Sequence, residues 1–464
     1  MAELADIGMV GLGVMGGNLA LNLAEKGFRV AVCDRDPALR AALASGEFGD
    51  SFIDCDAEGS LLAAIRPPRP VILLVPAGAP TDAALSALAI HAAPGDLLID
   101  AGNADFNDTR ARTSALEARG LKFLGIGVSG GAEGARNGPA LMAGGSPAIW
   151  DRVAPMFTAI AARHGEEPCA AWLGPDGAGH FVKTVHNGIE YADMQMIAEV
   201  YGLMRDGLGF DASRVAGVFS GWTEGPLASY LVEITGEVAR AKDAESGAPI
   251  LDIIADRAGQ KGTGRWSVIE AQRLGAVATT LEAAVAARNL SAASDLRAAL
   301  AKPSEVSVSL EASDLHDALN AGKIIAYAQG FDLLGKASAE YDWDLSLADI
   351  ARVWRAGCII RSRMLDEIAT AFEERPGASL LAAPEFSARL SSSVPALRRT
   401  VSAAVLAGLP VPALSNALAY LDQISRPRGT ANMLQGLRDY FGQHGFERTD
   451  RKGSGFHGPW VAGL

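Results

Sequence analysis

The sequence predicts an α/β domain with a doubly wound parallel sheet, followed by a large all-α domain and a short C-terminal tail. In the first part of the chain, short apolar runs alternate with stretches of helical periodicity, which is typical of parallel strands joined by helices. From about Gly177 onward, long stretches rich in Ala, Leu and Glu keep a helical period with little period-two alternation. The end of the chain is rich in glycine and basic residues. We therefore expect domains at residues 1–177 and 178–436 and a tail at residues 437–464.

The composition is that of a globular protein. With 464 residues, 49% of them hydrophobic and 20% charged, the chain is too long for one ordinary hydrophobic core. Its net charge of -13 argues against a broad surface for nucleic acid or anionic membranes, although a local basic pocket for a small anion remains open. No basic leader and no apolar run of membrane-spanning length is found, so we expect a cytoplasmic protein with neither nucleic-acid nor membrane partners.

The cysteines predict no metal site. The four residues, Cys33, Cys55, Cys169 and Cys358, form no CxxC pair and have no histidine at metal-ligand spacing. Reduced thiols are the simplest interpretation of such scattered cysteines.

The first domain begins with a strand, a glycine turn, a helix and a second strand. The expected ranges are 6–10 for the first strand, 18–26 for the helix and 28–33 for the second strand. Between the first strand and the helix, Gly11, Gly13 and Gly16 have the GxGxxG spacing. Glycines in this position let the backbone approach a pyrophosphate at the positive end of the helix. The motif, which also contains Val14 and Met15, predicts a Rossmann-like dinucleotide site.

Charged residues follow the second strand and bear on the choice of cofactor. Asp34 stands where a carboxylate can accept both hydroxyls of the adenosine ribose, which favours NAD. Arg35 can instead pair with a 2′-phosphate or stack on adenine, which favours NADP. The alternative is that both are ordinary charges at a strand end. The predicted cofactor is therefore NADP or NAD.

Three further strands bring candidate ligand contacts to one edge of the sheet. The expected strands are residues 71–75, 97–101 and 123–128. Ligands of such sheets bind beyond the carboxyl ends of the strands, where we expect Val75 and Asn103 near the cofactor and Asn103 also near the substrate. Ser129, Gly130 and Gly131 follow the last strand, and a hydroxyl beside two bare amides suits a carboxylate. The alternative is a plain glycine turn.

A polar helix face carries the most distinctive chemistry of the second half. Lys183, His186, Asn187, Glu190 and Tyr191 stand at i, i+3, i+4, i+7 and i+8 and therefore share one face. Burying such a row without a purpose is costly. Oxidation of an alcohol by a nicotinamide needs a base, which Lys183 can supply if burial makes it neutral, and Glu190 can act as the complementary acid. The alternative is a pair of ordinary surface charges.

Other basic residues are candidates for a phosphate site. Lys261 and Thr263 lie in a glycine-rich segment, and Arg288 lies on a helix of mostly small residues. Each by itself is also typical of a solvated surface. The tail is too small to fold alone, so we expect Phe456 and Trp460 to anchor it on the chain's own domains or on a second subunit.

The sequence resembles the 6-phosphogluconate dehydrogenase family over nearly its whole length. The motifs that carry the resemblance are, in order, GLGVMGGN, AGNADFNDTRAR, GVSGGAEGARNGPALMAGG, GHFVKTVHNGIEYADMQMIAEVY, AGQKGTGRW, AARNLS and LRDYFGQH. The resemblance implies the decarboxylating enzyme of the oxidative pentose phosphate pathway. That enzyme converts 6-phospho-D-gluconate to D-ribulose 5-phosphate and CO2 with reduction of NADP or NAD, and needs no metal.

The resemblance also implies roles for residues. Lys183 would be the base for oxidation at C3, the resulting 3-keto acid would lose CO2, and Glu190 would protonate C1 of the enediol. The residues implied to position the sugar acid are Asn103, Ser129, Gly130, Gly131, His186 and Asn187. Those implied on the phosphate side are Tyr191, Lys261, Thr263, Arg288, Arg438 and His444. In this family the tail threads through a homodimer, so Arg438 and His444 would reach the partner's site.

The sequence departs from the family pattern in two places. The family usually has alanine where Gly13 stands, and NADP-specific members usually carry Asn-Arg-Thr where this chain has Asp34, Arg35 and Asp36. A carboxylate at each end of that tripeptide repels a 2′-phosphate, by on the order of 1 kcal/mol or more at an effective dielectric near 20. Asp34 and Asp36 therefore lean towards NAD or dual use.

Two alternative functions stay open at this point. A related β-hydroxyacid dehydrogenase acting on another small acid would share the glycine motif and Lys183, but would not need Lys261, Arg288, Arg438 and His444 together. A non-catalytic dinucleotide-sensing protein would keep the fold, and the intact Lys183 and Glu190 count against it.

Overall fold

The computed structural model describes residues 3–260, 262–301 and 306–460. It forms two compact units, residues 1–417 and residues 418–464, which are described separately.

The first unit is built on an eight-stranded sheet in the order β10-β7-β6-β5-β4-β1-β2-β3. The strands are β1 (Ile7–Val10), β2 (Val30–Cys33), β3 (Phe52–Cys55), β4 (Pro70–Leu73), β5 (Leu97–Asp100), β6 (Lys122–Ser129), β7 (Ala140–Gly145) and β10 (Ala170–Gly174). Strands β1 to β6 are all parallel, which confirms the predicted doubly wound parallel sheet.

The far edge of the sheet was not predicted. Strand β7 pairs antiparallel with β6, and β10 pairs parallel with β7. The reversal follows from chain length, because residues 130–139 between β6 and β7 are too few for the crossover of about a dozen or more residues that a parallel pair needs.

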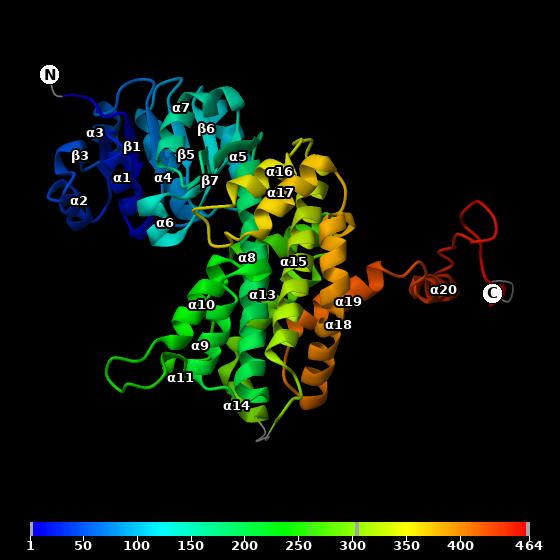
Figure 1. Cartoon of the computed structure of the whole chain (residues 1–464). Helices are drawn as coiled ribbons and strands as arrows, with labels where there is room; N and C mark the ends of the chain where they lie inside the picture. Colours follow the sequence, from blue (N-terminus) through cyan, green and yellow to red (C-terminus); the bar gives the residue numbers. More distant parts are fainter. Residues whose placement is uncertain (1–2, 261, 302–305, 461–464) are drawn as a thin grey trace. The chain divides into compact units, whose positions relative to one another are not determined.

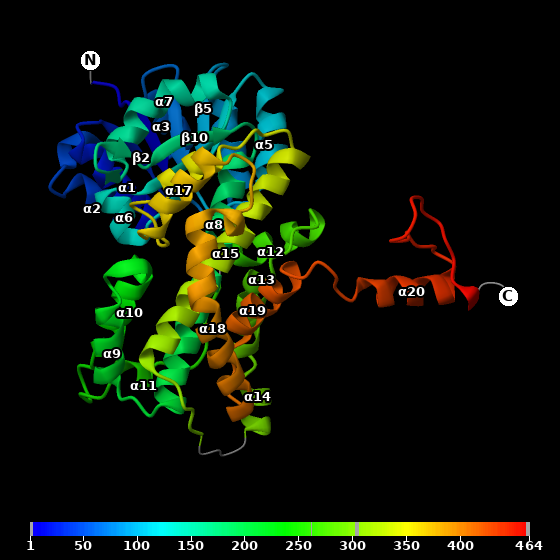
Figure 2. The same ribbon diagram turned by 45° about the vertical axis from the view of Figure 1, so that its right-hand side comes forward.

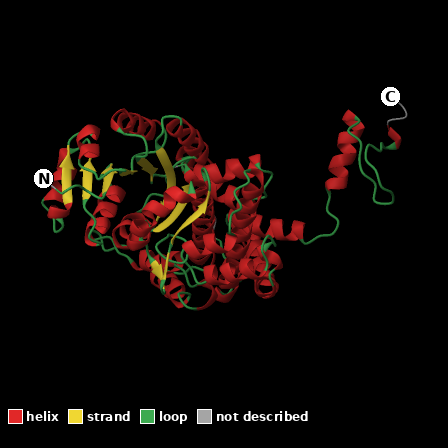
Figure 3. Ribbon diagram, turned by 90° about the horizontal axis from the view of Figure 1, so that it is seen from above, coloured by secondary structure: helices red, strands yellow, loops and turns green. Residues whose placement is uncertain are grey.

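Helices cover both faces of the sheet (Figures 1 and 3). They are α1 (Val14–Glu25), α2 (Pro37–Ala44), α3 (Glu58–Ala63), α4 (Ala79–His91), α5 (Phe106–Glu117), α6 (Gly131–Asn137) and α7 (Pro147–Ile160). The sheet separates two hydrophobic cores, and alternate residues of β2 contribute to each. Val30 and Val32 lie in one buried cluster, while Ala31 and Cys33 lie in the other. Helix α1 begins four residues earlier than predicted, directly at the glycine turn, which places its N-terminus beside the carboxyl end of β1.

The rest of the first unit is almost entirely helical, as predicted. After a small hairpin of β8 (Arg163–His164) and β9 (Glu167–Pro168), helix α8 (Ala178–Gly202) follows β10 and is buried along most of its length. The remaining α-helices of this unit are α9 (Ala212–Gly221), α10 (Tyr230–Arg240), α11 (Ile250–Ile253), α12 (Thr263–Arg273), α13 (Thr279–Ser291), α14 (Ser294–Leu300), α15 (Ala312–Glu340), α16 (Leu347–Val353), α17 (Met364–Glu374), α18 (Pro384–Ala407) and the first part of α19 (Pro412–Ile424). Helices α12, α13 and α15 pack along α8 (Figure 2).

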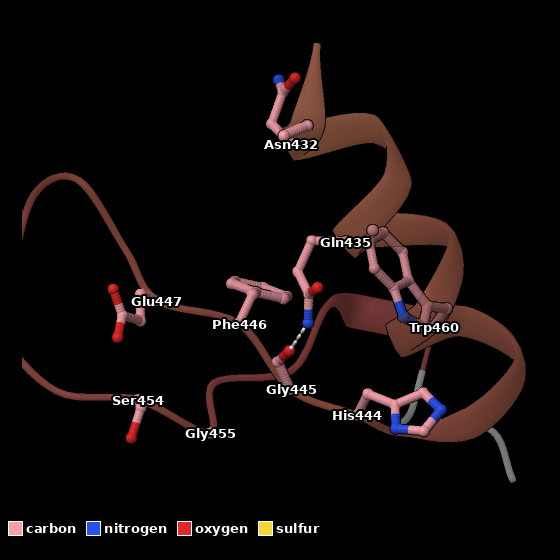
Figure 4. Close-up of a pocket in the computed structure, with 11 residues that line it drawn as sticks. Asn432, Gln435, His444, Gly445, Phe446, Glu447, Ser454, Gly455 and Trp460 are labelled. Atoms are coloured by element: carbon pink, nitrogen blue, oxygen red, sulfur yellow. Dashed lines mark hydrogen bonds between the residues drawn. The ribbon is translucent and has the colours of Figure 1, made fainter. Parts of the chain in front are cut away.

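The second unit contains the end of α19, helix α20 (Ala431–Gly442) and a C-terminal hairpin. Phe446 and Phe456 exchange backbone hydrogen bonds of 2.8 and 3.0 Å across the hairpin. A cavity of about 580 Å³ lies between α20 and the hairpin, where His444 and Trp460 are among the lining residues (Figure 4).

The centre of this unit is Asp439, which is 0% exposed. Its carboxylate accepts hydrogen bonds from the backbone of Gly445 and Gly458 and from the side chains of His457 and Trp460, at 2.6 to 2.9 Å. Within the unit Phe456 is half-buried and Trp460 is 37% exposed, so the predicted anchoring of these two rings on another body stays a prediction.

Candidate active site

The glycine turn after β1 is tight, and its first and last glycines stand where the backbone does not admit a side chain. Gly11 has φ of +89°, and a Cβ on Gly16 would lie 1.9 Å from the Gly11 carbonyl oxygen. A Cβ on Gly13 would meet nothing within 4 Å, so the alanine usual in the family fits there too. Gly13 caps α1 without a side-chain hydrogen bond, which leaves the first-turn amides, beginning at Val14, available to an anion. Val75 lines the same turn, 3.0 Å from a Cβ built on Gly11.

Asp34 is held rigidly beside this turn. One oxygen of its carboxylate accepts the Leu12 N–H at 2.6 Å, and the other accepts the Asp36 N–H at 2.8 Å. Each oxygen keeps lone pairs for further donors, as ribose hydroxyls require. The Asp36 carboxylate caps α2 by accepting the Ala38 N–H at 2.9 Å. Arg35 is exposed, and its side chain makes no hydrogen bond or ion pair with the described residues.

These residues fit a dinucleotide, because bare amides at a helix N-terminus and an oriented carboxylate are the groups that bind its pyrophosphate and ribose. Met15 packs against the hydrophobic core from the first turn of α1. Beside the turn, the end of β5 leads to Gly102, whose N–H donates to Asp100 at 3.0 Å, and to the exposed Asn103.

Ser129, Gly130 and Gly131 form a turn, called here the SGG turn. This turn and the polar face of α8 meet at the carboxyl edge of the sheet. Ser129 is the last residue of β6 and is 2% exposed, with its Oγ 3.2 Å from His186 Nε2. Gly130 and Gly131 have φ of +127° and +63°, conformations that favour glycine. The backbone of this turn therefore lies directly beside the helix face that the sequence singles out.

The polar side chains of α8 form a continuous hydrogen-bonded chain. Lys183 Nζ donates to Asn187 Oδ1 at 2.7 Å, and His186 Nδ1 lies 3.1 Å from the same oxygen. Asn187 Nδ2 donates to Thr263 Oγ1 at 2.7 Å. Because Asn187 Oδ1 can only accept, His186 Nδ1 carries the hydrogen and Nε2 accepts from Ser129 Oγ. The chain thus links Ser129, His186, Asn187 and Lys183 in one orientation.

Burial shifts the protonation of these groups in opposite directions. Lys183 is 6% exposed and His186 is 0% exposed. Burial lowers the pKa of Lys183, against the pull of Glu190, and it lowers the pKa of His186 well below its ordinary value, with Lys183 adding to the effect. Burial raises the pKa of Glu190, which the Asp193 charge also favours and the Lys183 and Arg288 charges oppose. Burial therefore makes the amine and the imidazole easier to deprotonate, and the carboxyl easier to protonate, than the same groups in water.

Residues predicted on the phosphate side are brought together in part. The Arg288 guanidinium lies over the Tyr191 ring, 3.5 Å from its centroid, and Gly264 packs against the same ring. Thr263 reaches the site through its bond with Asn187. Lys261 lies outside the described residues.

Arg438 and His444 belong to the second unit. There Arg438 donates to Gln435 at 3.0 Å, and the rings of His444 and Phe441 meet edge to face with centroids 6.1 Å apart.

Two contacts at the site come from residues that no sequence motif predicts. The Trp354 ring meets the His186 ring edge to face with centroids 5.5 Å apart. The Gly357 carbonyl oxygen lies so close to Gly130 that a Cβ built there would be 2.3 Å from it. No local signal could have found them, because they lie far along the chain from both partners.

Among the described residues, no group of three or more His, Cys, Asp or Glu side chains is placed to hold a metal ion. No described helix is long and apolar enough to cross a membrane.

Comparisons with known proteins agree over both parts of the chain. Residues 6–174 match the NAD binding domain of 6-phosphogluconate dehydrogenase, and residues 179–460 match the C-terminal domain of 6-phosphogluconate dehydrogenase. The NAD(+)-dependent decarboxylating 6-phosphogluconate dehydrogenase of Bacillus subtilis (strain 168) is 42% identical over 98% of this chain and 99% of its own. The NADP(+)-dependent enzyme of the same strain is 41% identical with the same coverage.

A solved structure gives the same result. The 6-phosphogluconate dehydrogenase of Plasmodium falciparum, described in its apo form and in complexes with NADP+ and with 6-phosphogluconate, superposes with a TM-score of 0.93 at 37% identity. The match covers 98% of this chain and 100% of that one. The resemblance found in the sequence motifs is thereby confirmed, and the chain belongs to the 6-phosphogluconate dehydrogenase family.

Proposed function

We propose that this enzyme oxidises and decarboxylates 6-phosphogluconate to ribulose 5-phosphate and CO2, with NAD or NADP as the oxidant. The observation that carries the proposal is the pairing of Lys183 and Glu190 on one helix face. Burial makes the amine easier to deprotonate and the carboxyl easier to protonate, as a base and an acid for successive steps require. Lys183 packs against Gly127 of β6, and the same sheet carries the glycine turn and Asp34 that fit the cofactor.

The chemistry divides between these two residues. Neutral Lys183 takes the proton of the C3 hydroxyl, and a nicotinamide cofactor held by the glycine turn and Asp34 would supply the acceptor for the C3 hydride. The product is a 3-keto acid, whose C1–C2 bond breaks with the electrons moving towards the ketone, and Lys183 returns its proton to that oxygen. Protonated Glu190 then gives a proton to C1 of the enediol while neutral Lys183 takes the proton of the C2 hydroxyl, which completes ribulose 5-phosphate.

The remaining residues of the site bind and orient the substrate. We assign the substrate carboxylate to Ser129 and the amides of Gly130 and Gly131, since bare amides are suitable donors and the Ser129 hydroxyl can turn from His186 Nε2 to donate to the carboxylate. The phosphate is assigned to Arg288 and Tyr191, with Thr263 and Lys261 from the same segment. Asn103, His186 and Asn187 are assigned to the sugar hydroxyls.

A coupled assay tests the proposal directly. Purified enzyme is incubated with 6-phosphogluconate and either cofactor, and reduced cofactor and CO2 are measured together. Equal amounts of both products are expected. Reduced cofactor without CO2 would identify a related β-hydroxyacid dehydrogenase activity, and cofactor binding without any turnover would identify a dinucleotide-sensing protein.

We further propose that NAD is the preferred cofactor. The two Bacillus subtilis relatives differ in cofactor but are 42% and 41% identical to this chain, so overall similarity does not decide the matter. The Asp34 carboxylate supports NAD because its fixed orientation presents oxygens to ribose hydroxyls and a negative charge to a 2′-phosphate.

We also propose a cytoplasmic homodimer in which the tail of each subunit completes the site of the other. The proposed functional division is residues 1–177 for the cofactor, 178–436 for the substrate and 437–464 for the partner's site. An apolar face of α20 supports a protein partner, because its side chains are 52% to 74% exposed at helical spacing. These side chains are Met433, Leu434, Leu437, Tyr440 and Phe441.

Complementation between two inactive variants tests the tail. Lys183→Met and Arg438→Ala are each expected to be inactive alone. When the two variants are co-expressed and pair at random, half of the dimers contain one subunit of each kind. One of the two sites in such a dimer has both Lys183 and Arg438, so about a quarter of the normal activity is expected. Complete inactivity of the mixture would mean that Arg438 serves its own subunit.

A further inference from the structure

The connection between α16 and α17 reaches the sheet at the SGG turn. The Gly357 carbonyl accepts the Ala140 N–H at 3.1 Å, at the start of β7. Gly357 has φ of +68°, and a Cβ there would lie 2.5 Å from Ala162 Cβ and 2.6 Å from the Gly138 carbonyl oxygen. The connection is therefore packed without clearance against the segment that joins β6 to β7.

The same carbonyl sets the position of Gly130. A Cβ built on Gly130 would lie 2.3 Å from the Gly357 oxygen and 2.9 Å from the Gly134 Cα. Gly130 is thus enclosed by the Gly357 carbonyl and Gly134 on the side where a side chain would project, so the Gly357 backbone limits where the Gly130 backbone can lie.

Trp354 fixes the other half of the substrate site. Its ring is 0% exposed and meets the His186 ring at an interplanar angle of 79°. The indole is itself held by Phe331, with ring centroids 5.5 Å apart, and its N–H donates to Met142 Sδ at 3.3 Å. The Cys358 thiol donates to the Trp354 carbonyl at 3.0 Å, which closes the turn. His186 therefore packs against a ring that is restrained on several sides.

We infer that residues 354–358 position the substrate-binding groups, with Gly357 holding the Gly130 backbone and Trp354 holding the His186 ring. Trp354 is a positioning residue in this scheme, because it acts on the substrate only through His186. The inference rests on the proposed roles of Gly130 and His186 in binding 6-phosphogluconate. The cofactor residues, from Gly11 to Asp34, lie outside this set of contacts, so the effect is expected on the substrate alone.

The test compares two buried tryptophans that differ in their contact with the site. Trp354→Leu removes the ring beside His186, and Trp354→Phe keeps an aromatic ring there. Trp343→Leu is the matched control, since Trp343 is 2% exposed and packs among aromatic rings, including those of Phe106 and Phe181, away from the polar face of α8. Steady-state kinetics with both substrates separate KM from kcat, and thermal unfolding records the stability of each variant.

Trp354→Leu is expected to raise KM for 6-phosphogluconate and lower kcat/KM by roughly 3- to 10-fold, the factor that loss of one aromatic pair implies. The KM for the cofactor is expected to stay within about twofold of the wild-type value, and Trp354→Phe is expected to recover most of the substrate affinity. Trp343→Leu is expected to lower the melting temperature while leaving both KM values unchanged. Equal kinetic effects of the two leucine variants, or no effect of Trp354→Leu on 6-phosphogluconate, would overturn the inference.

Met142→Leu provides a second test in case Trp354→Leu does not fold. Met142→Leu removes the acceptor of the indole N–H and keeps the side-chain volume, so KM for 6-phosphogluconate is expected to rise by about two- to threefold while the KM for the cofactor is unchanged. An unchanged substrate KM in this variant would also count against the inference. Wild-type enzyme without activity on 6-phosphogluconate would refute the proposed function instead, which keeps the two failures distinct.

Discussion

The charge of Asp34 should decide the cofactor preference, and Asp34→Asn tests it. In the wild-type enzyme the carboxylate is held by the N–H groups of Leu12 and Asp36 at 2.6 and 2.8 Å, so it cannot turn away from an incoming 2′-phosphate. Two unit charges about 5 Å apart repel by roughly 3 kcal/mol at an effective dielectric of 20. Asp34 is only half-buried, and salt and the neighbouring Arg35 screen part of this repulsion.

We therefore expect about 1.4 to 2.8 kcal/mol of discrimination to remain, which is 10- to 100-fold in kcat/KM. Asp34→Asn should raise kcat/KM for NADP by about tenfold, and it should lower the value for NAD several-fold because an amide offers one acceptor oxygen in place of two. The assay is initial-rate kinetics with each cofactor at saturating 6-phosphogluconate and fixed ionic strength.

Asp36→Asn is the matched control. Its carboxylate caps α2, and asparagine caps helices equally well, so this change should alter the cofactor ratio much less than Asp34→Asn. A wild-type enzyme that strongly prefers NADP, or an unchanged NADP/NAD ratio in Asp34→Asn, would refute the charge argument and assign the selection to Arg35.

Further outcomes follow from the buried ionisable groups. Lys183→Met should abolish turnover and leave cofactor binding, measured by fluorescence titration, nearly intact; near-normal activity would exclude Lys183 as the base. Glu190→Gln should slow CO2 release and enediol protonation more than cofactor binding, and an unaffected rate of CO2 release would remove Glu190 from the scheme. In the wild-type enzyme kcat/KM should follow a bell-shaped pH profile, falling at low pH as Lys183 is protonated and at high pH as Glu190 ionises, and a flat profile would contradict both roles. Glu199 accepts the N–H groups of Ala413 and Leu414 at 2.7 and 2.9 Å, so Glu199→Ala should lower the free energy of unfolding by about 1 to 3 kcal/mol. Because burial raises the pKa of Glu199 from 4.5 to about 7, its contribution should be largest below pH 4.5 and decline as pH rises through 7, as denaturant unfolding at several pH values can measure; a contribution that grows with pH would contradict this.

Local geometry explains why so much of the site could be predicted from the sequence. Lys183 and Asn187 are four residues apart, and any α-helix brings such side chains within reach, so the spacing permits their hydrogen bond of 2.7 Å. The glycine turn is equally local, because Gly11 and Gly16 approach each other through the backbone of one strand–helix unit. The sequence by itself therefore determined the strand–turn–helix order, the polar face of α8 and the family.

The tertiary structure decided what those local features contact. Ser129 meets His186 only because β6 ends beside α8, and Thr263 meets Asn187 only because α12 packs along that helix. The contact of Trp354 with His186 joins residues whose spacing in the chain carries no information about packing. Burial also decided the chemistry, since the pKa of Lys183 falls only when the surrounding helices exclude water from it. Sequence spacing fixes distances within a helix, whereas the dielectric around a side chain depends on every element packed against it.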